Sequence, residues 1–403
     1  MNKMLDKNCQ MKDSEIEWIG KIPKGWEVRR FSSCISKSNA GEVIPKEFWG
    51  KGCELLYTCA KEPLFSNYEG FPEDKRTQKG NLLLTRNGTP YIHIPKLNSI
   101  YSNVVQRVIL EKDNSSFIRY TLIQGSKSII GNGDIIESFN MGKWNSTSIP
   151  LPPLYEQQAI ANYLDEQIEK IDELIAEQNQ AIENWNTYKQ SLITEKVTKG
   201  LNPSVEMKDS GIEWIGEIPN DWNLARVKDV SYCLDAKRVP ISAEMRTTGN
   251  IPYWGAGNIV DYIDRYIFNE ELVLLGEDGA PFMDKDRPVA FYINSPIWAN
   301  NHIHVLRNKE NIKAKYLTYS LNCVDYYPFI GGSIIPKLTQ SSMKEIKLPL
   351  PSLQQQQAIV DYLDEKCLKI DQMIEQKQVL INQLEEYKQS LIYECVTGKR
   401  CVL

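Results

Sequence analysis

Two stretches of the 403-residue chain alternate apolar and polar positions with the period of a long helix. Residues 155–198 contain no proline or glycine and are rich in Ala, Gln, Glu, Leu and Lys, which all favour helices. Alternate steps of three and four residues give Leu164, Gln167, Ile171, Leu174, Gln178, Ala181, Trp185, Tyr188 and Leu192, and later Leu363, Lys366, Ile370, Met373, Lys377, Leu380, Leu384, Tyr387 and Leu391. This a/d stripe predicts two coiled-coil helices, each roughly 60 Å long.

The two stretches belong to a repeated frame. The sequence MKDSEIEWIGKIPKGWEVRR from Met11 recurs from Met207 with 13 of 20 positions identical, and the 49 residues from Pro150 recur from Pro349 with 26 identical. Two copies at this spacing predict internal pseudo-two-fold symmetry. Each helix needs an apolar partner, and polar residues interrupt both stripes at matching places, so we expect the helices to pack on each other antiparallel. Two unrelated bundle helices remain the alternative.

Between the frames lie two inserts, about residues 31–149 and 227–348, whose sequences do not resemble each other. Each has an apolar run followed by a polar pair and a glycine. Residues 81–86 predict a strand running into an Asn87-Gly88 turn, and residues 271–276 predict a strand running into an Asp-Gly turn. Because the frames match and the inserts differ, the frames should do one task twice while the inserts do two different tasks.

These patterns predict an α+β fold, in which two globular domains are joined by two long helices that form an antiparallel coiled coil. The expected boundaries are those of a first globular domain, a central helix, a second globular domain and a C-terminal helix: residues 1–149, 150–200, 201–348 and 349–403.

The net charge of −5 argues weakly against a nucleic-acid partner. Most of the acidity lies in the helices, however: residues 150–198 hold 3 Lys+Arg and 9 Asp+Glu, and residues 349–397 hold 4 and 8. Residues 11–149 hold 19 Lys+Arg and 15 Asp+Glu, so the first insert region is mildly basic. The charge therefore leaves DNA binding by the inserts open.

The compartment follows from the cysteines and from hydropathy. Nine scattered cysteines without paired spacing favour a reducing cytosol over a disulfide framework or a zinc site. No apolar run approaches the roughly 18 to 20 residues that span a bilayer. We expect a cytoplasmic protein that does not associate with membranes.

No arrangement of residues predicts catalysis. The chain lacks a G-x-x-x-x-G-K-[ST] phosphate loop, and Asn202-Pro203-Ser204 lacks the aromatic residue with which base-modifying methyltransferases grip a flipped base. His302 and His304 would share one face of a strand and could hold a metal, but a polar binding face is the favoured interpretation. We therefore expect no catalytic site, no cofactor and no metal.

Several strings carry a resemblance to a known family. They are LPPLYEQQAI from Leu151, YKQSLI from Tyr188 and again from Tyr387, YWGAG from Tyr253, LGEDGA from Leu275, NNHIHVL from Asn300 and LTRNG from Leu84. With them the chain resembles the specificity subunits of type I restriction-modification enzymes over essentially its whole length. It departs from the pattern where the second helix begins, with Gln355 and Ser352 in place of Glu156 and Pro153.

The resemblance implies a function. Each insert would be a target-recognition domain that reads one half of an asymmetric, gapped site in double-stranded DNA. The helices would set the separation of the two domains and dock two copies of an adenine methyltransferase subunit. Translocation and cleavage would come from a further nuclease/translocase subunit. The expected partner-binding residues lie at the two helix starts: Leu154, Gln157, Ile160, Leu353, Gln356 and Ile359.

Polar residues near turns are the candidates for reading DNA, because Arg and Lys suit guanine while Asn and Gln suit adenine. In the first insert they are Thr85, Arg86 and Asn87; in the second they are Asn300, Asn301, His302, Ser333 and Lys337. Two alternatives remain open at this stage. A purely structural coiled-coil adaptor would show no DNA preference, and a self-contained DNA methyltransferase-nuclease would bind S-adenosylmethionine alone.

The division of labour between frames and inserts gives a direct prediction. Exchange of residues 31–149 for the corresponding insert of another such subunit should change one half of the DNA target and leave the other half and the gap unchanged. Mapping the methylated sites of the hybrid complex measures this. A change in both halves would contradict the two-domain interpretation.

Overall fold

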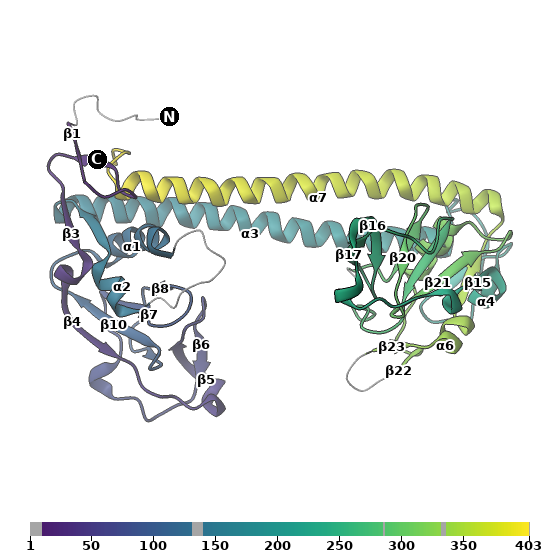
Figure 1. Ribbon diagram of the computed structural model, residues 1–403, viewed down its shortest axis with the longest axis horizontal. Coiled ribbons are helices and arrows are strands. Elements are labelled where there is room, and N and C mark those ends of the chain that lie inside the picture. The colour runs from purple at the N-terminus through teal and green to yellow at the C-terminus, as the bar shows by residue number, and fades with distance from the viewer. Residues whose placement is uncertain (1–9, 131–139, 285–286, 332–335, 403) are drawn as a thin grey trace. The chain divides into compact units, whose positions relative to one another are not determined.

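The computed structural model describes residues 10–130, 140–284, 287–331 and 336–402 (Figure 1). The chain forms two compact units, Met1–Glu177 with Leu380–Leu403, and Gln178–Val379. Each unit holds one insert together with parts of both long helices. The units divide the chain within the helices, whereas the boundaries expected from the sequence fall at the helix ends. Across the described part of the chain, no helix is both long enough and apolar enough to cross a bilayer.

The two long helices are α3 (Leu154–Lys199) and α7 (Leu353–Val396). Each begins immediately after a proline-containing strand end, where a helix cannot extend upstream. Gly200, with φ of +74°, follows the last residue of α3 and provides the left-handed conformation that ends many helices. The prediction of two long helices is confirmed.

In each unit α3 and α7 run antiparallel and are tied by equivalent ion pairs. Lys189 Nζ lies 2.6 Å from Asp371 Oδ1 in the second unit, and Lys388 forms the same pair with Asp172 in the first. Both residues of one pair are 199 positions from their counterparts in the other, which is the offset of the helix repeat. The predicted antiparallel pairing and pseudo-two-fold symmetry are confirmed in these contacts.

The polar interruptions in the two stripes meet each other. Lys377 Nζ donates a hydrogen bond of 3.0 Å to Gln178 Oε1, and these two positions are also 199 apart. Sliding one helix past the other would leave both polar groups against apolar neighbours, so the contact fixes the register. Around it the stripes supply buried residues to both cores, among them Leu164, Ile171, Leu192, Leu363, Ile370 and Leu391.

Besides its parts of α3 and α7, the first unit contains two sheets, two short ribbons and two α-helices among the residues that the structure describes. The four-stranded antiparallel sheet has the order β4 (Ile35–Ala40), β10 (Val105–Leu110), β7 (Asn81–Thr85), β8 (Ile92–His93). The three-stranded sheet has the order β6 (Leu64–Ser66), β5 (Trp49–Tyr57), β9 (Ile100–Tyr101). The ribbons and helices are β1 (Met11–Asp13) with β2 (Lys21–Pro23), β3 (Glu27–Arg30) with β11 (Ser148–Leu151), α1 (Ser115–Ile130) and α2 (Met141–Ser146).

The second unit repeats this arrangement. Its four-stranded sheet is β15 (Ser231–Cys233), β21 (Ile303–Asn308), β18 (Leu272–Gly276), β19 (Ala290–Ile293), and its three-stranded sheet is β17 (Ile259–Ile263), β16 (Thr248–Trp254), β20 (Trp298–Ala299). The ribbons are β12 (Met207–Asp209) with β13 (Glu217–Pro219), β14 (Asn223–Arg226) with β24 (Lys347–Leu350), and β22 (Ile330–Gly331) with β23 (Lys337–Leu338). The short helices are α4 (Val227–Val230), α5 (Ala314–Leu321) and α6 (Gln340–Glu345).

Both inserts therefore share one topology although their sequences differ. The third strand of each three-stranded sheet, β9 or β20, pairs parallel to the central strand. The predicted strands β7 and β18 are confirmed, and each pairs with the next strand along the chain. The prediction of a tight turn directly after each strand is wrong, because the strand pairing resumes only at Ile92 and at Ala290. Residues 86–91 instead form a longer loop, and in the second insert β18 and β19 are separated by more residues than a tight turn contains.

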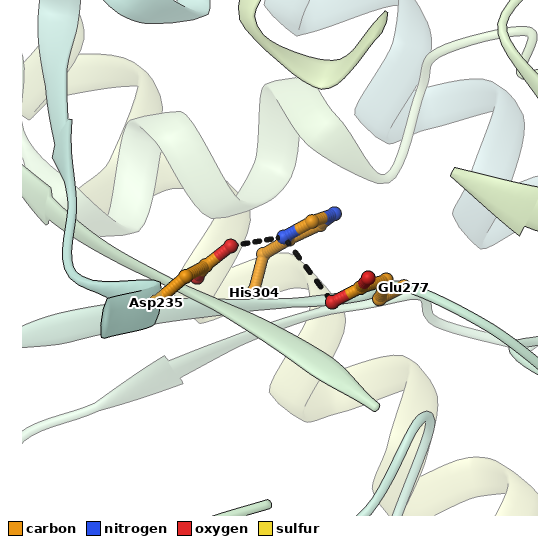
Figure 2. Close-up of side chains that lie close together, drawn as sticks. All are labelled: Asp235, Glu277 and His304. Carbon is orange, nitrogen blue, oxygen red and sulfur yellow. Dashed lines mark hydrogen bonds and ion pairs between the residues drawn. The ribbon is translucent and has the colours of Figure 1, made fainter. Parts of the chain in front are cut away.

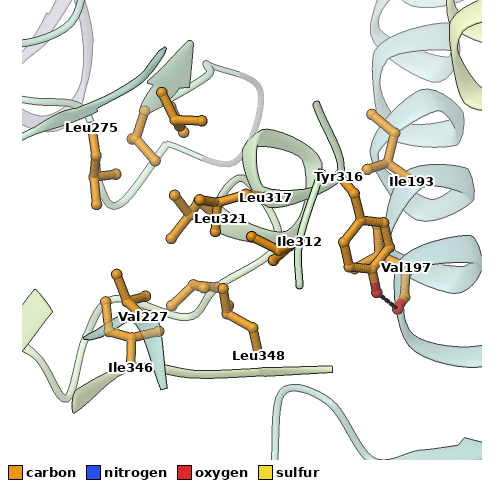
Figure 3. Packing of buried hydrophobic residues seen from close by; sticks show 14 of the residues in the cluster. Ile193, Val197, Val227, Leu275, Ile312, Tyr316, Leu317, Leu321, Ile346 and Leu348 are labelled. Carbon is orange, nitrogen blue, oxygen red and sulfur yellow. Dashed lines mark hydrogen bonds between the residues drawn. The ribbon is translucent and has the colours of Figure 1, made fainter. Parts of the chain in front are cut away.

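The core of the second unit anchors α3 to the insert (Figure 3). Ile193 and Val197 from the last turns of α3 pack in the same buried cluster as Tyr316 and Leu317 of α5. The Tyr316 hydroxyl, fully buried, lies 3.2 Å from the carbonyl oxygen of Val197, which satisfies a polar group that would otherwise be costly inside the core. The insert and the helix thus form one packed body.

A buried glutamine at each helix start fastens the helix to its insert. Gln157 accepts a hydrogen bond of 2.9 Å from the backbone N–H of Asn114 and donates to the Pro152 carbonyl at 3.0 Å. Gln356 accepts from the N–H of Lys313 at 2.8 Å and donates to the Pro351 carbonyl at 2.9 Å. The two side chains are 2% and 0% exposed, respectively. The duplicated QQ sequence therefore performs the same structural role twice.

The departure at Gln355 also has a structural consequence. In the first unit the Trp26 indole donates to Glu156 Oε2 at 2.8 Å. In the second unit Gln355 bonds instead to Asp221 at 3.0 Å, and among the described residues no acceptor lies within reach of the buried Trp222 Nε1. The two frames are thus equivalent in backbone but not in this hydrogen bond.

The buried glutamines predict a large and paired loss of stability. Gln157→Ala or Gln356→Ala leaves a buried backbone N–H and carbonyl without partners, so each should lower the free energy of unfolding by about 2 kcal/mol or more. Urea unfolding of the whole chain measures the loss. The exposed neighbours supply the controls, since Gln158→Ala and Gln357→Ala should stay within about 0.5 kcal/mol of the parent chain. Equal losses of stability at the buried and the exposed glutamines would show that Gln157 and Gln356 do not fasten the helices to their inserts.

Candidate nucleic-acid interface

In the second unit, backbone hydrogen bonds join the loop after β18, the segment before β21 and strand β23. The N–H of Glu277 donates to the His302 carbonyl at 3.0 Å, and the N–H of Leu338 donates to the Glu277 carbonyl at 2.7 Å. The N–H of Gly279 donates to the Pro336 carbonyl at 3.2 Å. Residues predicted to read DNA thus come together here from positions 300 to 302 and from 337.

A buried charged cluster lies where these segments meet the 3-10 helix η4 (Asp235–Lys237) (Figure 2). His304 is fully buried; its Nδ1 lies 2.6 Å from Asp235 Oδ2 and 3.8 Å from Glu277 Oε2. Its Nε2 lies 2.9 Å from the carbonyl oxygen of Leu338. Both ring nitrogens face acceptors, so the hydrogen bonds are complete when both nitrogens carry protons.

Asp235 is held as a carboxylate. Burial raises the pKa of this group, but the hydrogen bond and charge of His304, the N–H of Val305 and the charge of Arg238 outweigh burial and lower the pKa to about 2. The pKa is below that of the unfolded chain, so this stabilisation is complete above the ordinary aspartate pKa and is lost only as the pH falls toward 2. At neutral pH Asp235 therefore keeps its negative charge.

The cluster has the composition of a metal site, but its groups already have partners. The ligand atoms of Asp235, Glu277 and His304 lie within 4.8 Å of one another. However, both nitrogens of His304 are engaged, and Arg238 lies 2.6 Å from Glu277 and 3.5 Å from Asp235. Arg238 also donates to the Ile303 carbonyl at 2.9 Å. The arrangement works as an internal salt-bridge clamp that holds the surrounding loops together.

Above this clamp lies a set of more exposed charges. Lys337 Nζ is 3.3 Å from Glu277 Oε1 and 3.7 Å from Asp278 Oδ2, and His302 Nδ1 contacts the other oxygen of Asp278. The side chains of Lys337, His302 and Asp278 are 48%, 49% and 25% exposed. These three residues present donors and an acceptor to solvent from a fixed backbone.

The other second-insert candidates differ in accessibility. Asn301 is exposed. Asn300 is only 8% exposed, and its Oδ1 accepts a hydrogen bond of 2.8 Å from the N–H of His302, so it shapes the segment. Ser333 lies outside the described residues.

In the first insert the candidates surround the loop after β7. Thr85 is fully buried; its hydroxyl donates to the Thr89 carbonyl at 2.8 Å and accepts from the N–H of Tyr91 at 3.0 Å, so it shapes the loop. Arg86 is half-buried and donates to the Asn103 carbonyl at 3.0 Å. Asn87 is exposed. Of the three, Arg86 and Asn87 have side-chain atoms that reach solvent.

The six residues expected to bind a partner protein also divide into exposed and buried ones. Leu154 and Leu353 are 55% and 44% exposed at equivalent positions of α3 and α7. The other four, Gln157, Ile160, Gln356 and Ile359, are at most 4% exposed and contact their own units. A docking role for these four would require the units to open, so their observed role is internal packing.

Sequence reasoning missed Asp235, Arg238, Glu277 and Asp278. Acidic side chains repel phosphates, so Glu277 and Asp278 in the LGEDGA string do not by themselves predict a DNA contact. The partners of the clamp are also far apart in the sequence: Asp235 and His304 are 69 positions apart. Strand alternation places His302 and His304 on one face, so it did not predict that His304 is buried while the His302 side chain is half exposed.

Comparison with known proteins places the chain in a family. A sequence profile described as the type I restriction modification DNA specificity domain matches residues 23–184 and again residues 219–386. The chain belongs to this family. The two matches correspond to the two copies of the frame with their inserts.

Individual relatives agree. The chain is 25% identical over 420 aligned residues to the putative type I restriction enzyme MjaX specificity subunit of Methanocaldococcus jannaschii, covering 94% of this chain and 95% of that protein. It is 35% identical over 136 residues to a putative type I restriction enzyme specificity subunit of Haemophilus influenzae, a match that spans 34% of this chain and 35% of the relative. A solved structure from work on complex assembly and conformational transition of the type I R-M system has the same fold, with a TM-score of 0.68, 15% identity, and coverage of 95% and 99% of the two chains.

His93 on β8 lies beside the loop after β7 in the first insert. Its protonation should make the stability of the folded chain depend on pH. Burial and then the charge of Arg119 lower the pKa of His93 to about 4. The unfolded chain takes up this proton near pH 6.5, so stability should fall as the pH drops from 6.5 to 4.

His93→Phe should reduce that loss, because the substituted chain has no imidazole to protonate on unfolding. Urea unfolding at several pH values measures the difference between the two chains, and measurements at pH 7.5, where the imidazole is neutral in both states, serve as the control. An unchanged pH slope in the variant would show that His93 is not the group responsible.

Proposed function

We propose that the chain is the DNA specificity subunit of a type I restriction-modification complex, in which each insert reads one half of a bipartite, gapped site. The observation that carries the proposal is a duplicated frame bearing two inserts of one topology and different loop chemistry. A protein that needed one binding function twice would repeat the loops with the frame. Different loops on equivalent scaffolds suit two different half-sites.

The loops after β7 and β18 are the proposed reading surfaces. They end equivalent central strands of the four-stranded sheets. In the first insert the reading residues would be Arg86 and Asn87, and in the second they would be Asn301, His302 and Lys337. Thr85 and Asn300 would position these loops from inside. Fixed loops favour specificity, since the ordering cost is met before DNA binds.

The two helix starts are the proposed docking sites for methyltransferase subunits. Exposed Leu154 and Leu353 occupy equivalent positions, so two copies of one partner could make the same contact twice. Methyl transfer would then belong to those partners, and DNA translocation and cleavage to a nuclease subunit. This chain would supply recognition and assembly.

The test is to co-express the chain with a type I methyltransferase subunit that forms a soluble complex with it, and to map methylated adenines in the host DNA. We expect a single gapped motif, methylated on both strands and lost when this chain is omitted. Methylation without a motif, or a soluble complex without methylation, would favour a structural adaptor and overturn the proposal.

A further inference from the structure

We propose that Lys337 and Asp278 together read one G·C base pair in the half-site assigned to the second insert, an inference that rests on the proposed DNA-reading function. The two side chains come from different segments but lie side by side, with Nζ and Oδ2 3.7 Å apart. That separation exceeds hydrogen-bonding distance. The ammonium and the carboxylate are therefore close enough to face one base pair without being hydrogen-bonded to each other.

The surrounding contacts hold both groups in place. Residues Asp278 and Lys337 form a backbone bridge, and Glu277 Oε1 lies 3.3 Å from the Lys337 ammonium on its other side. Glu277 is in turn held by Arg238 at 2.6 Å. His302 occupies Oδ1 of Asp278, which leaves Oδ2 for an external donor. A reading pair fixed in this way loses little conformational freedom on binding.

The chemistry of the pair matches guanine and cytosine. An ammonium only donates, and guanine offers two adjacent acceptors, N7 and O6, at its major-groove edge. A carboxylate only accepts, and cytosine offers its N4 amino group beside guanine O6. An A·T pair separates its two acceptors, adenine N7 and thymine O4, by the adenine N6 amino group, so the ammonium would meet one acceptor and not two adjacent ones, which is a poorer match.

The described loop after β7 in the first insert has no such pair at the corresponding positions. At the end of β7 the loop continues with Arg86, Asn87 and Gly88, whereas at the end of β18 it continues with Glu277, Asp278 and Gly279. Both glycines have positive φ, +72° and +73°, so the backbone adopts the same left-handed conformation at this position of each loop. Base discrimination that depends on a lysine and an aspartate acting together should therefore be confined to the half-site of the second insert.

The experiment uses the complex of the full chain with its methyltransferase partner. The half-site of the second insert is the one that persists when residues 31–149 are exchanged. Methylation rates are then measured on duplexes in which each base pair of that half-site is varied, for the parent chain and for Lys337→Gln, Asp278→Asn and the double variant. Lys347→Gln, which removes an exposed charge on β24, is the matched control.

We expect one G·C position at which the parent chain discriminates and at which both single variants lose about tenfold or more of that discrimination. The double variant should lose no more than the larger single loss, since the pair acts as a unit. The other half-site and the Lys347→Gln complex should retain the parent preferences. Unchanged melting temperatures would show that the losses are not due to unfolding.

Two other results would overturn the inference while leaving the proposed function intact: a sequence motif with no G·C pair sensitive to either variant, or loss of discrimination at an A·T pair. Absence of any motif in the parent complex would instead overturn the proposed function, and this inference with it.

Discussion

The pairing of α3 with α7 is the contact on which the rest of the structure depends. Neither helix could keep its apolar stripe in water without a partner, and each finds that partner in the other copy of the frame. The ion pairs Lys189–Asp371 and Lys388–Asp172, with the Gln178–Lys377 contact, fix how far one helix may slide along the other. Gln157 and Gln356 then fasten the inserts to these helices, whose register is set by the contacts between α3 and α7.

The inserts show how one scaffold supports different surfaces. Their sheets have the same strand order and the same parallel third strand. The loops after β7 and β18 therefore begin at equivalent places in the two inserts. In the second insert a buried set of charges fastens three segments together and leaves Lys337 and Asp278 outside. In the first, Thr85 and Arg86 use hydroxyl and guanidinium bonds to nearby carbonyls. Rigid loops are thus obtained by unrelated means.

The sequence predicted features that repeat or that have a period. The helices, their antiparallel pairing and the role of the matched polar positions follow from the stripe and from the offset of 199 residues. It could not predict that Gln157 and Gln356 face inward, because a polar residue beside a helix start looks exposed until its backbone partners are known. The common topology of the inserts and the Asp235–His304 pair depend on contacts between distant strands, which leave no local pattern.

The division of the helices between units has a consequence for how the chain is made. Leu391, Ile392, Cys395 and Val396 are buried in the core of the first unit, yet they are synthesised after the whole of the second unit. The second unit, Gln178–Val379, is contiguous and can close its core earlier although it is synthesised later. During synthesis the first insert therefore waits with an incomplete apolar surface, and a chain truncated before Leu391 would expose that surface to aggregation.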